Sequence, residues 1–232
     1  MTGEGASMQR MAVKTKFYIG SGLILLLFCL GTALLFYRFE KGTVEKEIFK
    51  ETEIYIAAVD ATRTYVKDVL RPRMYDLIPD DHFIVEAMST SYVGREVMGR
   101  VHERFKDFRY RRSALNPINP QSLAMGEEAE MIRRFNADPA LREWSGLIQR
   151  EGRDHYVRFR AITADASCLH CHGDPADTPE DIVALYGQRQ DPEPYIIGSV
   201  VGTDAVYIPV TGPFSRIKRH AWLAFISGAS IL

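Results

Sequence analysis

The longest uncharged stretch of the chain, residues 17–37, restricts its fold more than any other sequence feature. These 21 residues would form a helix of about 31 Å, long enough to cross the hydrocarbon core of a bilayer. A cleaved signal peptide would have a shorter apolar stretch and a small-residue cleavage site, and residues 34–38 (LLFYR) offer none. We therefore expect an uncleaved transmembrane helix at 17–37, preceded by a cytoplasmic tail at 1–16.

A second constraint comes from the five residues Cys168-Leu169-His170-Cys171-His172. Two cysteines separated by two residues and followed by a histidine form the attachment signature of c-type haem. Each thiol adds to one vinyl group of the haem, and this spacing lets both sulfurs reach the porphyrin edge from one turn of backbone. The next side chain can then bind the iron axially. We expect one haem c, with Cys168 and Cys171 as covalent tethers and His172 as the proximal iron ligand.

Two other chemistries use the same cysteine spacing. A thioredoxin-like redox site would lie near a βαβ pattern, and no such pattern surrounds these cysteines. A structural zinc site would need a second cysteine or histidine pair at suitable spacing, and none is evident in the sequence. Cys29 falls inside the apolar stretch and is interpreted as a small residue of a membrane helix.

The haem signature also predicts the side of the membrane on which the main domain lies. Basic residues both precede and follow residues 17–37, so the positive-inside rule gives no orientation. Haem is attached to c-type apocytochromes on the outer side of the bacterial inner membrane, which places a domain of residues 38–215 in the periplasm. Residues 221–232 are apolar but too few to cross a bilayer. We interpret residues 216–232 as the start of a second transmembrane helix, as in a transmembrane receptor.

The composition is that of an ordinary globular domain. Charged residues make up 25% of the chain and the net charge is −1, whereas a nucleic-acid-binding surface would require a basic excess. The sequence also lacks a nucleotide-binding loop and a hydrolytic triad. Nucleic acid is therefore excluded as a partner, and no catalytic domain is recognised in this chain.

Periodicity and turn signals predict an α+β fold, in which an antiparallel sheet is flanked by helices and a long helix continues from the membrane segment. Apolar residues at helical spacing place that helix at residues 42–70. A hydroxyl residue at 89–91 is expected to cap a helix running to about residue 105, and the alternation of residues 154–163 predicts a strand. The other expected elements are helices at 127–135 and 139–148, a strand at 107–115, and two strands within 198–210 joined by a hairpin turn at 202–204.

Five short segments carry a resemblance to a known family. They are residues 71–75 (RPRMY), 88–97 (MSTSYVGREV), 110–117 (YRRSALNP), 157–160 (VRFR) and 168–175 (CLHCHGDP). In this combination the chain, over residues 51–210, resembles the periplasmic haem c-binding sensor domains, PAS-like in fold, at the N-terminal end of bacterial histidine kinases and methyl-accepting chemotaxis receptors. The resemblance implies a haem-bearing sensory domain whose signal crosses the membrane to a cytoplasmic kinase or chemotaxis module. By analogy with such receptors, a homodimer is expected.

The resemblance also implies a position for a sixth iron ligand. In the family a sulfur-bearing residue at the end of the first long helix can bind the iron, and the matching residue here is Met74. The alternative is that Met74 packs in the core, as methionines usually do. His155, His82 and His102 are rival ligands, whereas His170, between the two tethers, is expected to point away from the iron.

Five arginines of the predicted strands are candidates to pair with haem propionates through charge-assisted hydrogen bonds, and solvated strand faces are the alternative. They are Arg109, Arg111, Arg112, Arg158 and Arg160. The leading functional hypothesis is a membrane-anchored haem c sensor of redox state or of a diatomic gas. The second is a monohaem cytochrome c, anchored by one helix, that transfers electrons. Peroxidase chemistry would need a distal His/Arg pair, which the sequence does not place.

Overall fold

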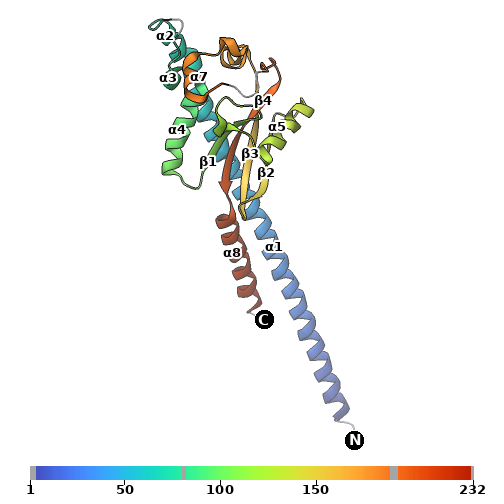
Figure 1. The fold of residues 1–232 in the computed structure, drawn as a ribbon. Coiled ribbons are helices and arrows are strands. Elements are labelled where there is room, and N and C mark those ends of the chain that lie inside the picture. The colour runs from blue at the N-terminus through green and yellow to red at the C-terminus, as the bar shows by residue number, and fades with distance from the viewer. Residues whose placement is uncertain (1–3, 80–81, 189–192, 231–232) are drawn as a thin grey trace. The chain divides into compact units, whose positions relative to one another are not determined.

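The computed structural model describes residues 4–79, 82–188 and 193–230 (Figure 1). The chain divides into two compact units. Residues 48–209 form one unit, and residues 1–47 together with 210–232 form the other.

The unit of residues 48–209 is built on a four-stranded sheet. Its order is β1-β4-β3-β2, and each neighbouring pair is antiparallel. The expectation of an α+β fold with an antiparallel sheet and flanking helices is confirmed. The strands are β1 (Arg109–Ala114), β2 (Glu143–Arg150), β3 (Arg153–Thr163) and β4 (Val200–Pro209).

One face of the sheet packs against α5 (Glu127–Ala137) through an apolar core (Figure 1). Successive side chains of a strand point to opposite faces, so Ala205 and Tyr207 of β4 face this helix. They are buried with Phe135 of α5 and Phe159 of β3. The predicted strand at 154–163 and the predicted helix at 127–135 are both confirmed, because each presents one apolar face to the other.

The opposite face packs against the last turns of α1 (Glu4–Tyr65). Ile56 and Val59 of this helix are buried with Val206 of β4. Around this small apolar contact, the arginines of β3 form ion pairs with acidic residues of α1. Arg158 pairs with Glu53, and Arg160 Nη1 lies 2.6 Å from Asp60 Oδ2. Ion pairs therefore help to hold α1 on the sheet, as the pairs of Arg111 with Glu128 and of Arg150 with Glu127 do for α5.

Helix α1 continues beyond Tyr65 through a π-helical turn, η1 (Val66–Leu70), into α2 (Arg71–Tyr75). The backbone N–H of Arg71 donates to the carbonyl oxygen of Val66, the five-residue step of a π turn. Pro72 lies in the first turn of α2, directly after the π turn, and its missing N–H removes one hydrogen bond from the continuous helix at this point. The predicted helix at 42–70 is confirmed.

The remaining helices of this unit are short, apart from α4 (Thr90–Arg104). Ser89 is its cap, as predicted, because Ser89 Oγ accepts a hydrogen bond from the Tyr92 N–H (3.2 Å). The others are α3 (Val85–Met88), α6 (Leu169–His172), α7 (Glu180–Tyr186) and the 3₁₀ turns η2 (Pro120–Ser122), η3 (Ala166–Cys168) and η4 (Pro175–Asp177).

The predicted helix at 139–148 is wrong, since this segment contributes strand β2. Asp138 ends α5 and accepts a hydrogen bond from the Ala140 N–H (3.0 Å) instead of starting a new helix. From Glu143 onward, exposed and half-buried side chains alternate, and Trp144 and Ile148 pack against the core under α5. A two-residue turn with positive φ at Glu151 (53°) and Gly152 (72°) then leads into β3.

The predicted hairpin turn at 202–204 is also wrong, because β4 runs without interruption through these residues. Gly202 pairs with Ala114 on one side and Ile162 on the other. A Cβ at this position would lie 2.5 Å from the carbonyl oxygen of Ser113, so the glycine permits close approach of β1 and makes no turn.

The other unit contains residues 13–47 of α1, with mostly exposed apolar side chains, and α8 (Thr211–Ala229). Lys41 lies over the Phe214 ring and Cys29 lies against Gly228, so the two helices are antiparallel neighbours. Within the described ranges, the N-terminal helix alone is long and apolar enough to cross a membrane, and such a helix serves as an anchor or as a signal sequence. Residues 1–3 of the predicted tail and 231–232 of the predicted second span lie outside the described residues.

Candidate functional site

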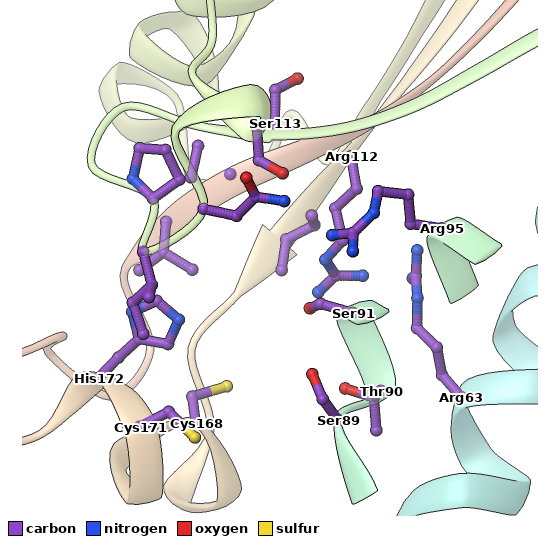
Figure 2. A pocket seen from close by; sticks show the side chains of 18 of the residues that line it. Arg63, Ser89, Thr90, Ser91, Arg95, Arg112, Ser113, Cys168, Cys171 and His172 are labelled. Carbon is purple, nitrogen blue, oxygen red and sulfur yellow. The ribbon is translucent and has the colours of Figure 1, made fainter. Parts of the chain in front are cut away.

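A cavity of about 860 Å³ lies within the unit of residues 48–209 (Figure 2). One wall comes from consecutive turns of the α1–η1–α2 helix, with Arg63, Thr64, Lys67 and Arg71. The other walls come from α4, from β1 and from the loop that follows β3.

The segment Cys168–His172 forms one short helical turn at this cavity. Asp165 caps the preceding 3₁₀ turn η3, which ends at Cys168, by accepting a hydrogen bond from the Ser167 N–H (2.8 Å), and Gly173 ends the helical turn by donating its N–H to Leu169 O (2.8 Å). Because the two cysteines are three residues apart on this turn, their side chains lie on the same side of it. Cys168, Cys171 and His172 all line the cavity, as Figure 2 shows.

Both thiols are half-buried and neither forms a disulfide. Burial raises the pKa of Cys171 to about 11, although the nearby charge of Arg71 opposes this effect. Burial also raises the pKa of Cys168. A thioredoxin-like motif depends instead on a lowered thiol pKa, so the electrostatics of this pair do not favour that alternative. Among the residues that the structure describes, no group of three or more His, Cys, Asp or Glu side chains is placed to hold a metal ion by itself.

The imidazole of His172 is held by stacking. The His172 ring lies 4.2 Å from the Tyr195 ring, centroid to centroid, at an angle of 7°. The backbone carbonyl oxygen of His172 also accepts a hydrogen bond from the Tyr195 N–H (2.8 Å). His170 also lines the cavity, and its Nε2 lies 3.2 Å from Tyr75 Oη. Burial, with a smaller effect of Arg71, lowers the pKa of His170.

Met74 is half-buried on α2 and packs beside an apolar cluster that contains Phe83, Met88 and Ile182, next to Cys171. It is not one of the described residues that line the cavity. The assignment of Met74 as a sixth ligand therefore stays a prediction.

The rival histidines lie in three different places. His82 is exposed, and His155 lies at the start of β3 with its Nδ1 3.0 Å from Arg153 O, outside the cavity lining. His102 does line the cavity, but its Nδ1 is 2.5 Å from Phe108 O. The buried Met98, one turn before His102 on α4, lines the cavity as well and was not expected from the sequence.

The cavity separates the five candidate arginines into two groups. Arg109, Arg111 and Arg112 line it, whereas Arg158 and Arg160 pair with acidic residues of α1 outside it. Sequence reasoning missed three further arginines of the wall, Arg63, Arg71 and Arg95. Two of them occur in the segments 71–75 and 88–97, which the resemblance had singled out, so that signal was available.

The residues present fit a covalently attached haem. The cavity volume falls within the range of about 300–1,000 Å³ that is usual for cofactor sites. Two thiols at the required spacing and an oriented imidazole are at one side, and guanidinium groups suited to carboxylates are in the wall. Apolar side chains complete the lining, among them Phe83, Pro117, Ile118, Ile182 and Tyr186.

Comparisons with known proteins agree with this description. The crystal structure of the cyanobacterial heme-protein Tll0287 is similar, with a TM-score of 0.53 and 22% sequence identity, over 70% of this chain and 95% of that chain. At this identity the likeness shows the fold alone. No curated protein matches the sequence. The family model described as Tll0287-like matches residues 41–209, most of the chain, and the chain therefore belongs to the Tll0287-like family.

Proposed function

We propose that this protein is a membrane-anchored sensor that carries one covalent haem c in the cavity of residues 48–209. The observation that carries the proposal is the placement of Cys168, Cys171 and His172 on one helical turn in the cavity wall. The two thiols would form the thioether bonds and His172 would bind the iron. The solved relative with the same fold is itself a heme-protein, which supports the same cofactor here.

When bound, the haem would supply a redox-active iron that can also bind a diatomic gas. The chain's own residues prepare the site for it. Tyr195 fixes the plane of the His172 ring, and the apolar side chains of the lining would limit the access of water to a bound iron. Met74 is proposed as the second axial ligand; a small movement of α2 would be needed to bring it into the cavity, because it lies beside the lining.

The position of α1 supports a sensory role. Helix α1 contributes Arg63 and Thr64 to the cavity wall, and the same helix contains the uncharged residues 17–37. Lys67, on the turn that follows, forms an ion pair (2.8 Å) with Asp165, which caps the cysteine-containing turn. A change at the haem would thus alter contacts made by this helix, and a helix that shifts as a rigid element can pass a change across a membrane.

The apolar part of α1 is proposed to be an uncleaved anchor in the bacterial inner membrane, with residues 48–209 in the periplasm. Apolar side chains such as Phe17, Leu23 and Leu35 are exposed on it, as expected for lipid contact. Helix α8, which packs antiparallel to it, is proposed as the start of a second span. A cytoplasmic kinase or chemotaxis module and a second copy of the chain are the proposed partners.

A one-helix-anchored cytochrome c is the second candidate. The observation that favours it is that one helix of the described residues meets the criterion for a membrane span. The two candidates differ in what happens to α1. In a sensor, a spin label on an exposed position of α1 such as Phe49 should report different mobility in the ferric and ferrous protein, whereas in a simple electron carrier it should not.

Covalent attachment is the first test. The full chain, produced in bacteria that mature c-type cytochromes, should keep its haem absorbance after denaturation and acid-acetone extraction. Cys168→Ala and Cys171→Ala should each lower the retained haem, because one thioether bond is lost. Cys29→Ala, in the apolar helix, is the matched control and should retain it fully. Loss of all colour from the wild-type protein on extraction would refute the proposal.

A further inference from the structure

The wall of the cavity carries an excess of positive charge. Among its described residues seven are lysine or arginine, and Asp165 is the one acidic residue. Three of these cations form close ion pairs of 2.7–2.8 Å, Lys67 with Asp165, Arg63 with Asp204 and Arg111 with Glu128. A ligand with two negative groups would offset part of the positive charge of the other four.

Arg95 and Arg112 have hydrogen-bond donors available for such a ligand. Arg95 uses one Nη to donate to Tyr186 Oη (3.2 Å), and its Nε lies 3.8 Å from Glu96. The guanidinium of Arg112 makes no hydrogen bond to any described residue. Its Nη1 lies 3.5 Å from the buried carboxylate of Asp204. Each guanidinium has five N–H donors, so most of them are open.

These two groups lie at the side of the cavity that a tethered porphyrin's carboxylates would reach. The thioether bonds form at the vinyl edge of haem, and its two propionates extend from the opposite edge. Figure 2 shows the guanidinium groups of Arg95, Arg112 and Arg63 facing the cavity on the side away from Cys168 and Cys171. If the vinyl edge were fixed at the cysteines, these arginines would be placed to bind the propionates.

We propose, on the basis of the haem attachment proposed above, that Arg95 and Arg112 bind the two haem propionates. Asp204 is the residue that positions Arg112, because the Asp204 carboxylate lies 3.5 Å from Arg112 Nη1. The same carboxylate accepts hydrogen bonds from both Nη atoms of Arg63 (2.8 and 2.9 Å). The propionate site is thus joined through one buried carboxylate to α1.

The other arginines of the sheet are less suited to this role. Arg111 donates to Glu128 (2.7 Å) and to Leu123 O (3.2 Å), so much of its donor set is used. Arg158 and Arg160 lie outside the cavity lining, where α1 supplies their partners. Of the arginines expected from the sequence as propionate partners, Arg109 and Arg112 both line the cavity with open donors, and Arg112 is preferred because it is half-buried and held near Asp204, whereas Arg109 is exposed at the start of β1.

Resonance Raman spectroscopy of the haem-loaded full chain tests the proposal, because the propionate-bending bands report hydrogen bonding to the propionate oxygens. Arg95→Gln and Arg112→Gln should each shift these bands, and Arg112→Lys should restore part of the shift. Both Gln variants should also lower the midpoint potential, since a positive charge that favours the ferrous state is removed. Arg160→Gln is the matched control. It removes the same charge from the neighbourhood of Asp204 (3.6 Å) but outside the cavity, and should leave the bands unchanged.

The outcomes separate this proposal from the haem assignment itself. The proposal is supported if the haem is covalent and the propionate bands move in Arg95→Gln and Arg112→Gln but not in Arg160→Gln. The proposal is overturned if the haem is covalent but the bands stay unmoved in the first two variants, or move equally in all three. In that case the haem assignment remains intact. If Arg112→Gln does not fold, Arg95→Gln decides, because the half-buried side chain of Arg95 lies on α4, where its polar partners among the described residues are Glu96 and Tyr186 and do not include Asp204.

Discussion

Replacing Asp204 with asparagine should strongly destabilise the unit of residues 48–209. The Asp204 carboxylate is 2% exposed. It accepts two hydrogen bonds from Arg63 and one from Tyr110 Oη (2.5 Å), and Arg112 and Arg160 lie 3.5 and 3.6 Å away. Asp204→Asn would leave Arg63, whose side chain is 12% exposed, with Asp60 at 3.4 Å as its remaining carboxylate. Breaking a buried ion pair on one side costs about 3–5 kcal/mol, and we expect a loss of that size.

Urea denaturation of the full chain in detergent, followed by circular dichroism, measures this loss. The matched control is Asp76→Asn, which removes the same charge from the exposed Arg73–Asp76 pair (68% and 65% exposed) and should cost less than about 1 kcal/mol. If Asp204→Asn costs no more than this control, the carboxylate does not support α1 on the sheet as argued here.

The pH dependence gives an independent check on the same group. Burial alone would raise the pKa of Asp204, but the charges of Arg112 and Arg63 and the hydrogen bonds to the carboxylate outweigh it and hold the pKa well below its usual range. A lowered pKa in the folded state adds stability above the unfolded-state value of about 3.9, and this contribution is lost as the pH falls below it. The stability difference between wild type and Asp204→Asn should therefore shrink from pH 6 to pH 3. A constant difference would contradict a lowered pKa.

Two further substitutions test the packing around the cavity. Gly202→Ala should lower the free energy of unfolding by about 1–3 kcal/mol, because the new Cβ would lie 2.5 Å from the backbone oxygen of Ser113. Gly42→Ala is the control: it has open space around it in α1 and should stabilise by about 0.5–1 kcal/mol. Thermal unfolding compares the two variants. Lys67→Gln should change stability by less than about 1 kcal/mol, because its pair with Asp165 is largely exposed. The same change should raise the pKa of Asp165, which hydrogen bonds from Lys67 and Ser167 hold below its usual range, and a carboxyl NMR titration that shows no rise would contradict this contact.

Features set by neighbouring residues could be predicted from the sequence. The Cys168–His172 turn, the Ser89 cap of α4 and the alternation of β3 each depend on residues within one or two turns of each other. The errors arose where distant contacts decide the structure. Asp138 and Pro139 resemble a helix start, yet the segment after them forms an edge strand because Trp144 and Ile148 reach the core under α5.

The arginines of the site illustrate the same limit. Arg63 and Arg95 lie on helices, where a charged side chain is expected to face solvent. Whether such a face borders a cavity depends on how α1, α4 and β1 pack, and no local pattern encodes that packing. The sequence treated the five strand arginines as one group, and only tertiary structure separates Arg112 at the cavity from Arg158 of β3, which pairs with Glu53 of α1.

The two faces of the sheet differ in a way that bears on signalling. The α5 face is closed mainly by an apolar core around Phe135 and Phe159, beside one buried ion pair between Glu128 of α5 and Arg111 of the cavity wall. The α1 face depends on ion pairs, whose strength varies with the charges around them. Because Asp204 lies between Arg63 of α1 and Arg112 of the cavity, a change in negative charge beside Arg112 alters how strongly the carboxylate holds α1. Under the proposed function, α1 would thus be the element whose attachment to the sheet responds to charge in the cavity through two linked arginines, and α5 would be coupled to the cavity through the Arg111–Glu128 pair.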